Sequence, residues 1–380
     1  MQVVGTNGKG TTALSLARAL GAEGHPAGAY LSPHLISYTE RVRLGGRYAS
    51  EEEFAAGMGR AIRTADEHGI SASQFELLTA GALLMFAEAG LSWAVLEAGL
   101  GARHDATSAA GAEAVVLTNV ALDHTEYLGD TVEEIAAEKL ASLHSGSTLI
   151  LGSGDRTVVQ AARRACESVG AGLVEAWDSE LDPAETPELA SLAPYARRNV
   201  ALGLRAAGTL LGHDVRSETR REVAARTGLP GRFERAELRG VPVVVDGGHN
   251  PAGLAAALDG VCSVYPGRPL GVVFAALRGK DIPSMLAALK DRADSLRIVR
   301  PDNERAAEPG WIQREFGPRD SRGRGAELEG DVGEALERAV AEMEETGGVV
   351  LVTGSLYTAA EALSRLRRSG ESGERLDEGR

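Results

Sequence analysis

The sequence predicts an α/β protein: a doubly wound, mainly parallel sheet that contains a phosphate-binding loop (P-loop), followed by a smaller Rossmann-like α/β domain. Three observations predict this fold class. Short aliphatic runs alternate with longer stretches of helical spacing, which is typical of parallel βαβ units. The chain has 380 residues, enough for two domains. A glycine-rich turn with one lysine separates the first expected strand from the first expected helix.

This turn, residues 5–12, has the layout of a loop that binds phosphate. Two valines precede it, and the helical pattern of residues 13–20 follows. Gly5, Gly8 and Gly10 let the backbone approach an anion closely. The N-terminus of the following helix offers free N–H groups and the positive end of the helix dipole. The turn therefore favours a bound nucleotide.

Side chains in the turn support the same interpretation. Lys9 can reach the β- and γ-phosphates of a nucleotide, and Thr11 or Thr12 can contact Mg²⁺. The strict Walker pattern places its lysine six positions after the first glycine, whereas Lys9 follows Gly5 by four. An ordinary glycine-rich turn of a doubly wound domain is the alternative interpretation.

Composition excludes several classes of protein. Hydrophobic residues make up 43% and aromatic residues 4%, so we expect an aliphatic core. The net charge of −14 argues against a nucleic-acid partner, because phosphates need a basic face. The two cysteines lack disulfide or zinc spacing, and no apolar run or leader predicts a membrane span or secretion. We expect a cytoplasmic protein that acts as a monomer, without a membrane or nucleic-acid partner.

The first domain is expected at residues 1–228. Thr131 can cap its fourth expected helix, whose first turn carries Glu133 and Glu134. The expected strands begin at residue 2 or 3 and continue at 27–30, 93–97, 114–118 and 147–151; the expected helices are 13–20, 51–68, 74–89, 131–143, 157–169, 193–211 and 216–226.

Pro230 and Gly231 indicate a hinge, which we place at residues 229–236. A smaller domain is expected at 237–368, and the polar residues 369–380 are expected to form a disordered tail. No stable element is predicted in residues 301–328. The expected strands of this domain are 243–245 with Pro242 at its start, 269–275, 296–299 and 348–352; the expected helices are 252–264, one after Lys280-Asp281, 331–344 and 355–367.

Polar side chains collect where the expected strands end, which is the edge where open α/β sheets bind ligands. Each has an ordinary alternative role: Glu97 could cap a helix, His124 could have local partners in a loop, and Lys139 could be a solvated cation. Together they predict a pocket of converging polar groups. Mg²⁺ prefers oxygen ligands, so Thr11, Ser32 and Glu97 would suit it together with ATP phosphates. The residues at strand ends are Lys9, Thr11, Ser32, His34, Glu97, Asp123, His124, Asp246, His249 and Asn250.

Taken in order, the motifs resemble those of the folylpolyglutamate synthase/dihydrofolate synthase family in the Mur ligase superfamily. The resemblance runs from residue 5 to residue 355, nearly the whole chain. The Ser-Pro-His-Leu run at 32–35 and the Leu-Asp-His-Thr run at 122–125 favour this family over other Mur-type ligases. The matching segments are 5–11, 30–35, 39–41, 75–79, 97–107, 118–126, 135–139, 230–234, 246–251 and 354–355.

The resemblance implies an ATP-dependent ligation. ATP phosphorylates a folate or pteroate carboxylate to an acyl phosphate, and the amine of L-glutamate attacks it to leave an amide, ADP and phosphate. Because a carboxylate and a triphosphate repel each other, metal ions and cations must offset their charges. The family has two Mg²⁺ sites, and K⁺ is a further candidate cation. The alternatives are another Mur-type ligase with a different acyl substrate, and a protein that binds ATP but has lost catalysis.

The resemblance also implies residue roles. By position, Ser32 and Glu97 match one Mg²⁺ site, and His124, with Glu97 shared, matches the other. Lys139 matches a lysine that the family carbamylates. The expected catalytic residues are Lys9, Glu97, His124 and Lys139. Nucleotide contacts are expected at Gly5, Asn7, Gly8, Lys9, Gly10, Thr11, Asn199, Arg232 and Asp246. Substrate contacts are expected at Phe75, Glu76, Arg103, Asp105, His249 and Asn250.

The sequence departs from the family pattern in places. The usual Gly-Gly-Arg-Leu-Asp run is Gly-Ala-Arg-His-Asp at residues 101–105, and Ser108 stands where an asparagine is usual. Arg198 replaces the polar residues often found before Asn199. The family also carries a further segment before the loop, on the pterin side of the substrate. These departures concern the pterin site more than the ATP chemistry.

Overall fold

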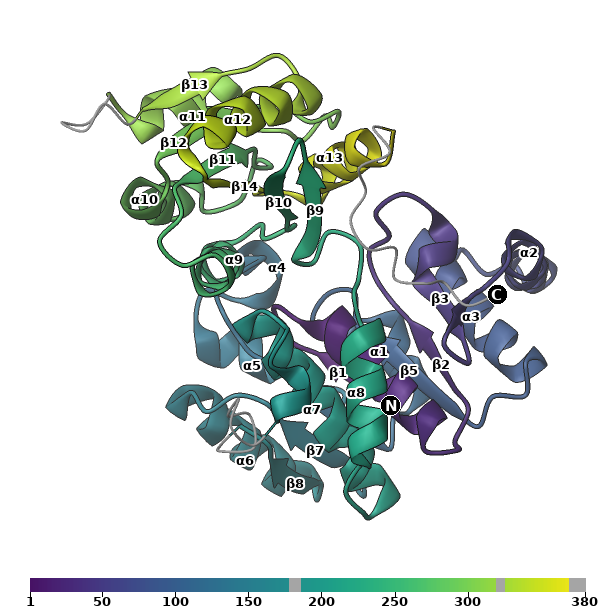
Figure 1. The fold of residues 1–380 in the computed structure, drawn as a ribbon. Helices are drawn as coiled ribbons and strands as arrows, with labels where there is room; N and C mark the ends of the chain where they lie inside the picture. The colour runs from purple at the N-terminus through teal and green to yellow at the C-terminus, as the bar shows by residue number, and fades with distance from the viewer. Residues whose placement is uncertain (178–185, 319–324, 369–380) are drawn as a thin grey trace. The chain divides into compact units, whose positions relative to one another are not determined.

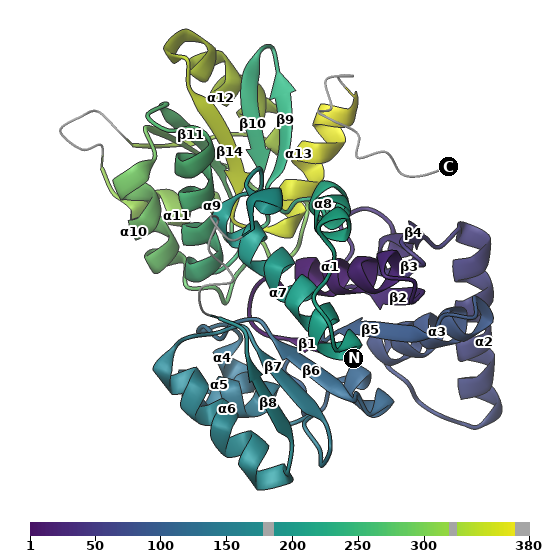
Figure 2. The same cartoon turned by 60° about the horizontal axis from the view of Figure 1, so that its bottom comes forward.

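The computed structural model describes residues 1–177, 186–318 and 325–368, so the predicted tail at 369–380 lies outside the described residues. The chain divides into two compact units. Among the described residues, the first unit contains those of Met1–Leu192 and Ala196–Thr227, and the second contains Ala193–Tyr195 and those from Gly228 to Arg368. Each unit has its own sheet with helices packed around it (Figures 1 and 2).

The first unit is built on one large sheet. Its strands are β1 (Gln2–Val4), β2 (Ala27–Tyr30), β3 (Val42–Leu44), β4 (Arg47–Tyr48), β5 (Trp93–Glu97), β6 (Ala114–Leu117), β7 (Thr148–Leu151) and β8 (Gly172–Glu175). In the described part of the chain this sheet has eight strands in the order β4-β3-β2-β5-β1-β6-β7-β8. The strands from β2 to β8 in that order pair in parallel, and β3 and β4 add an antiparallel edge.

Helices cover both faces of this sheet, because strand residues alternate between the faces. Val4 and Leu117 pack against α5 and α6 on one face, and Leu96 packs against α3 on the same face. The helix α1 packs on β2 and β5 from the opposite side. The doubly wound, mainly parallel arrangement is therefore confirmed. The helices are α1 (Lys9–Ala22), α2 (Glu51–Glu67), α3 (Gln74–Glu88), α4 (Thr125–Leu128), α5 (Val132–Lys139), α6 (Arg156–Val169), α7 (Pro194–Leu211) and α8 (Ser217–Arg226).

The second unit has a smaller mixed sheet. Its strands are β9 (Glu234–Leu238), β10 (Val241–Val245), β11 (Leu270–Phe274), β12 (Ser295–Ile298), β13 (Ala326–Leu328) and β14 (Val349–Thr353). Within the described residues their order is β13-β12-β11-β14-β10-β9, and β9 pairs antiparallel while the other pairs are parallel. The helices are α9 (Pro251–Val264), α10 (Ile282–Arg292), α11 (Pro309–Phe316), α12 (Val332–Thr346) and α13 (Leu356–Arg368).

Several boundaries differ from the sequence-based expectation. The helix expected at 131–143 ends at Lys139, because Leu140 already caps it. β9 begins at Glu234, so part of the expected hinge at 229–236 is a strand. β3, β4, β8, α11 and β13 were not predicted, the last two within residues 301–328. Pro242 lies inside β10 rather than before it, and it is tolerated there because the pairing with β14 starts only at Val243.

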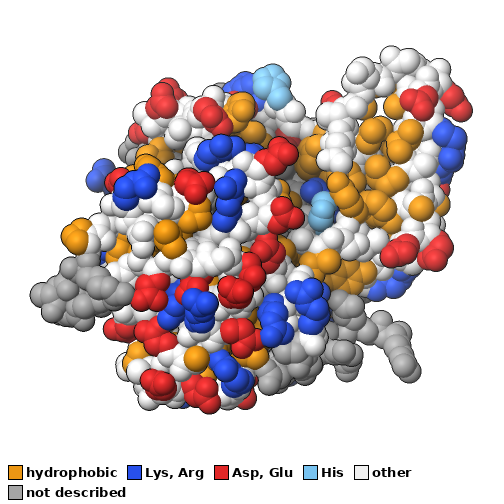
Figure 3. Space-filling model, turned by 90° about the horizontal axis from the view of Figure 1, so that it is seen from above, with side chains coloured by type: hydrophobic (Ala, Val, Ile, Leu, Met, Phe, Trp, Pro, Cys, Tyr) orange, Lys and Arg blue, Asp and Glu red, His pale blue; other side chains and the backbone are white. Residues whose placement is uncertain are grey.

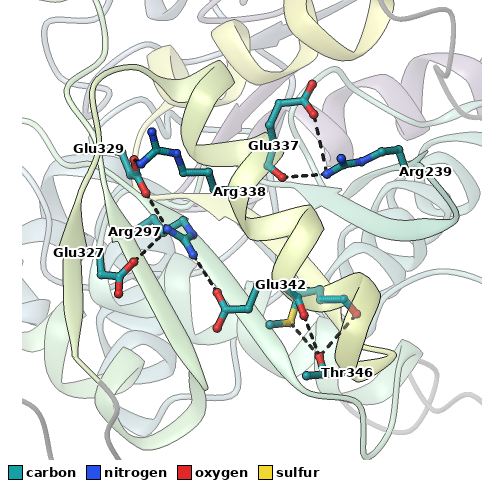
Figure 4. Close-up of polar contacts among 9 residues, drawn as sticks. Arg239, Arg297, Glu327, Glu329, Glu337, Arg338, Glu342 and Thr346 are labelled. Atoms are coloured by element: carbon teal, nitrogen blue, oxygen red, sulfur yellow. Dashed lines mark hydrogen bonds and ion pairs between the residues drawn. The ribbon is translucent and has the colours of Figure 1, made fainter.

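One arginine ties together the outer strands of the second sheet. Arg297 on β12 donates to Glu327 at 3.0 Å and to Glu329 at 2.6 Å on the β13 side, and to Glu342 of α12 at 3.0 Å (Figure 4). The Arg297 and Glu329 side chains are 12% and 3% exposed. Removing one partner of a largely buried ion pair is costly, because the other charge stays desolvated.

We expect Arg297→Ala to lower the free energy of unfolding by about 2 kcal/mol, since Glu329 keeps only its bond to Arg338. The matched control is Arg300→Ala, which removes an exposed pair with Glu308 and is expected to cost no more than about 0.5 kcal/mol. Urea unfolding of the intact protein measures both changes. Equal decreases in the free energy of unfolding of the two variants would show that the buried Arg297 ion pairs stabilise the protein no more than an exposed ion pair does.

Charges are mixed on the face of the molecule shown in Figure 3. Lys and Arg side chains (blue) lie among Asp and Glu side chains (red), so the described residues of that face form no continuous basic surface. Among the helices of the described chain, none has both the length and the apolar character needed to cross a bilayer.

Candidate active site

The end of β6 clamps the glycine-rich loop. Gly5 has φ +146°, and a Cβ atom there would lie 1.9 Å from the Thr118 hydroxyl oxygen, so only glycine fits. The Thr6 N–H donates to the Asn119 carbonyl at 2.9 Å. The Asn119 side-chain amide forms two hydrogen bonds with the Asn7 backbone. It accepts from the Asn7 N–H at 3.1 Å and donates to the Asn7 carbonyl at 2.9 Å. The loop backbone is therefore fixed before any ligand arrives.

The other flank of the loop rests on α7. Gly8 has φ +82°, and a Cβ there would lie 2.3 Å from the Asn199 side-chain oxygen. The Thr12 hydroxyl donates to the Asn199 carbonyl at 3.1 Å. Asn199, a predicted nucleotide contact, thus packs against the loop at Gly8, and the Thr12 hydroxyl is used in the hydrogen bond to α7. Of the two threonines considered for a metal, this leaves Thr11.

The N-terminus of α1 suits an anion. The helix begins at Lys9, its N-cap is Gly8, and its first turn contains no acidic residue. The N–H groups of the first turn and the positive dipole end are therefore not offset by a carboxylate in that turn. The Lys9 ammonium lies 3.4 Å from the Thr6 carbonyl oxygen, folded over the loop.

A second lysine reaches the same loop from α5. Lys139 is 4% exposed, and its ammonium donates to the Gly5 carbonyl at 2.9 Å. Burial, together with the nearby charge of Lys9, lowers the pKa of Lys139 to about 7. The neutral amine form of Lys139 is therefore much more accessible near neutral pH than it is for an ordinary lysine.

Glu97 and Ser32 meet at the same edge of the sheet. β5 pairs with β1 and with β2, so Glu97 lies opposite Val3 and one position beyond the Tyr30–Leu96 pair. The Glu97 carboxylate is 4% exposed and accepts the Ser32 N–H at 2.8 Å. The structure therefore brings two predicted metal ligands into contact.

His124 and Thr11 complete the predicted metal ligands. His124 is the N-cap of α4 with φ 52°, and its backbone N–H donates to the Asp123 carboxylate at 2.9 Å. Thr11 lies in the first turn of α1. No group of three or more His, Cys, Asp or Glu in the described residues could hold a metal by itself. Mg²⁺ takes few protein ligands beside phosphates and water, so the oxygen donors Thr11, Ser32 and Glu97 fit it.

Some predicted substrate residues have structural tasks. Glu76 forms the capping box of α3 with Ser73. Asp105 accepts the N–H groups of Gly99 and Leu100 at 2.9 and 3.0 Å, which fixes the loop after β5. Asn250 caps α9 by accepting the Gly253 N–H at 2.7 Å. These contacts account for the three side chains without a substrate.

Two other predicted substrate residues border the loop after β5. The Phe75 ring packs 5.8 Å from the Tyr30 ring, and its edge lies 2.8 Å from where a Gly99 Cβ would be. Arg103 is exposed and donates to Glu138 at 2.9 Å, directly before Lys139 in the chain. Phe75 therefore offers an apolar surface and Arg103 a cation on the rim of the first unit's site.

In the second unit, the predicted residues gather around the loop after β10. The Asp246 carboxylate accepts the Phe233 N–H at 2.9 Å and the Gly248 N–H at 2.8 Å. The Arg232 guanidinium lies against Gly247, 2.7 Å from where a Cβ there would be. The His249 Nδ1 lies 3.0 Å from the Gly247 carbonyl oxygen. Arg232, Asp246 and His249 therefore lie together around the loop after β10, with Asp246 buried beneath it.

Sequence reasoning missed two residues that shape these sites. Asn119 clamps the loop, and its signal was available, because it is a polar residue directly after an expected strand. Tyr195 donates to the Asp246 carboxylate, and no local pattern could have indicated a partner 51 positions away.

A clamped phosphate-type loop beside a buried lysine and carboxylate, at the edge of a doubly wound sheet, defines a nucleotide-dependent α/β enzyme. Residues 3–175 match the Mur ligase middle domain, and residues 231–356 match the Mur ligase glutamate ligase domain. The dihydrofolate synthase/folylpolyglutamate synthase of Escherichia coli is 34% identical over 97% of this chain and 87% of that protein. The chain belongs to the dihydrofolate synthase/folylpolyglutamate synthase family of ATP-dependent Mur ligases.

A longer relative is also similar. The probable bifunctional folylpolyglutamate synthase/dihydropteroate synthase of Haloferax volcanii is 33% identical over 97% of this chain. The chain spans 46% of the length of that protein.

Solved structures share the fold. Mycobacterium tuberculosis folylpolyglutamate synthase complexed with ADP has a TM-score of 0.85 at 25% identity and covers 96% of this chain and 89% of that one. E. coli FolC in complex with DHPP and ADP has a TM-score of 0.81 at 30% identity, covering 97% and 88%. A bifunctional folylpolyglutamate synthase/dihydrofolate synthase with Mn, AMPPNP and L-glutamate bound has a TM-score of 0.80 at 30% identity, covering 96% and 89%. Nucleotide and divalent-metal binding are thus properties of this chain's structural relatives.

Proposed function

We propose that this chain uses ATP to join L-glutamate to a folate or pteroate carboxylate through an acyl phosphate. The observation that carries the proposal is the contact of Lys139 with the Gly5 carbonyl, 2.9 Å apart. It places a buried lysine with a pKa of about 7 directly on a phosphate-type loop. A structural P-loop domain has no need of such a lysine, whereas carboxylate activation by ATP requires a set of charges around the phosphates.

Lys139 would act as a carbamate. Its neutral amine attacks CO₂ and loses a proton, which leaves N-bound carboxylate in place of a cation. Burial favours this exchange, because the low pKa supplies neutral amine at physiological pH. The product is an anion that can face a metal ion beside the loop. Lys9 and the N-terminus of α1 would then hold the phosphates of ATP.

Oxygen donors around the loop would hold the metal. We assign Thr11, Ser32 and Glu97 to one Mg²⁺, and His124 with Glu97 to a second. The bound metal would offset the repulsion between the substrate carboxylate and the triphosphate. The Ser32 backbone N–H helps to orient the Glu97 carboxylate. K⁺ stays a candidate for a further cation site.

The remaining site residues would bind the nucleotide, the incoming glutamate or the folate. Arg232 and Asp246 are the nucleotide contacts that we expect in the second unit, and His249 would face the incoming glutamate or the phosphates. Phe75 offers a ring surface and Arg103 a cation to the folate side. Glu76, Asp105 and Asn250 would act indirectly, by fixing the backbone around these groups.

Phosphate release from ATP tests the proposal. We expect release that requires both L-glutamate and either dihydropteroate or tetrahydrofolate, with mass spectrometry showing the added glutamate. Activity with one acceptor decides between dihydrofolate synthase and folylpolyglutamate synthase. Release with another acyl acceptor only would indicate a different Mur-type ligase. ATP binding without release under any of these conditions would indicate lost catalysis, and either result contradicts the proposal.

Other properties stay predictions. We propose that the catalytic domains lie close to the predicted boundaries 1–228 and 237–368, with all of β9 in the second because it pairs with β10. We also propose that the protein acts as a cytoplasmic monomer. Sedimentation of the purified protein measures the oligomeric state.

A further inference from the structure

Tyr195 belongs to the second unit, although it lies more than thirty residues before Gly228, where the rest of that unit begins. It lies in the first turn of α7. Residues Ala193–Tyr195 group with the second unit, whereas Ala196–Thr227 group with the first. Its hydroxyl donates to the Asp246 carboxylate. Burial and the adjacent Asp246 raise the pKa of Tyr195 well above its ordinary value, so the hydroxyl stays protonated and remains a donor.

The Asp246 carboxylate joins three segments of chain. One oxygen accepts both the Tyr195 hydroxyl and the Phe233 N–H, and the other accepts the Gly248 N–H. Asp246 is 4% exposed, so its charge is stabilised by these donors rather than by bulk water. Tyr195 is the one side-chain donor among these three bonds, and the other two come from the backbone.

The same bonds hold the turn that carries Arg232. Phe233 is in the left-handed region at φ 50°, which is unfavourable for a bulky residue. Its N–H bond to Asp246 and the bond from the Gly247 N–H to the Gly231 carbonyl, 2.8 Å long, hold the turn in this conformation. The Tyr195 ring also packs edge-on to the Phe233 ring, with centroids 6.1 Å apart. Arg232 lies between Gly231 and Phe233 in the chain, and both of these neighbours are held by hydrogen bonds.

We propose that Tyr195 is a positioning residue for the nucleotide: it fixes Asp246, and through Asp246 and Phe233 it fixes the turn that presents Arg232 to ATP. This inference rests on the proposed function, in which Arg232 and Asp246 bind the nucleotide. The role concerns binding geometry in both ground and transition states, so it acts on affinity for ATP and ADP more than on the chemical step.

The test removes one hydroxyl. Tyr195→Phe keeps the ring contact with Phe233 and removes the donor to Asp246. We expect the KM for ATP and the Kd for ADP, measured by calorimetry without turnover, each to rise about tenfold, while kcat stays within about twofold. The matched control is Tyr265→Phe, which removes a hydroxyl at the end of α9 outside this set of bonds and is expected to leave ADP binding unchanged.

A double-mutant cycle separates positioning from general stability. If Tyr195 acts through Asp246, Tyr195→Phe added to Asp246→Ala, which removes the acceptor, weakens ADP binding no further than Asp246→Ala alone. A lower Tm in Tyr195→Phe with unchanged KM and Kd would reduce Tyr195 to a structural role and overturn the inference. Additive losses in the cycle would also overturn it. Failure of the wild-type protein to bind ADP, in contrast, contradicts the proposed function itself.

Discussion

Replacement of Lys139 by alanine is expected to lower kcat by about 10³-fold or more, because it removes the site of the carbamate beside the phosphate loop. The wild-type enzyme is expected to lose activity in CO₂-depleted buffer and to regain it with bicarbonate. Carbamate forms only from the neutral amine, and the pKa of Lys139 is about 7. The bicarbonate requirement should therefore grow as the pH falls below 7, where the amine becomes protonated.

Two measurements check this result. Steady-state phosphate release gives kcat for wild type and variant, and ¹³C NMR of protein in labelled bicarbonate detects the carbamate carbon. Lys290→Ala is the matched control, because Lys290 is a lysine of α10 whose ammonium lies over the Phe316 ring and has no part in the phosphate loop. Full activity of Lys139→Ala, or a labelled carbamate signal that persists in it, would refute the assignment.

The second large effect is expected at Glu97. Glu97→Gln keeps the length of the side chain and an oxygen that can accept the Ser32 N–H, so the fold should be preserved. It removes the negative charge that would face the metal. We expect kcat/KM to fall by about 10²-fold or more, and the Mg²⁺ concentration for half-maximal activity to rise.

A magnesium titration of activity measures both changes. Glu53→Gln is the control, since Glu53 also accepts a backbone N–H, from Ser50, but forms the exposed capping box of α2. It should leave the Mg²⁺ dependence unchanged. A Glu97→Gln enzyme with normal Mg²⁺ dependence would exclude Glu97 as a metal ligand, even if its activity were low.

Long amphipathic and buried elements could be predicted from the sequence because their signals are local. Thr131 caps α5 as predicted, and α2 and α3 begin at the predicted residues 51 and 74, where the structure shows Ser50 and Ser73 as their caps. The strands β5, β6 and β11 are short, mostly apolar runs. For such elements, the preference of the segment and its place in the fold agree.

The elements that escaped prediction are short and depend on a neighbour. β9 reads Glu-Arg-Ala-Glu-Leu, which has little strand preference, and it forms because it pairs with β10. β3 and β4 carried a usable signal in Gly45 and Gly46, which turn between them with positive φ. Three-residue strands such as β13 have too few residues for any periodicity to be visible.

Some residues of the candidate site could be predicted from the sequence, whereas contacts between distant positions could not. The glycine loop, Lys139 and Glu97 follow from position at strand ends and from the motif order. Contacts that span the chain do not: the Asn119 side chain reaches Asn7 across 112 positions. Motif position also does not reveal that Glu76 and Asn250, both predicted substrate contacts, take part in capping a helix.

The place of Tyr195 has a consequence for recombination among members of this family. The sequence that matches the glutamate ligase domain begins at residue 231, but the second unit also contains Ala193–Tyr195. A crossover at that border would exchange Asp246 without exchanging the tyrosine that donates to it. Chimeras joined near residue 230 take the two partners from different parents, whereas chimeras joined before residue 193 take both partners from one parent. The segment that should be exchanged as one piece is therefore longer than the matched glutamate ligase domain.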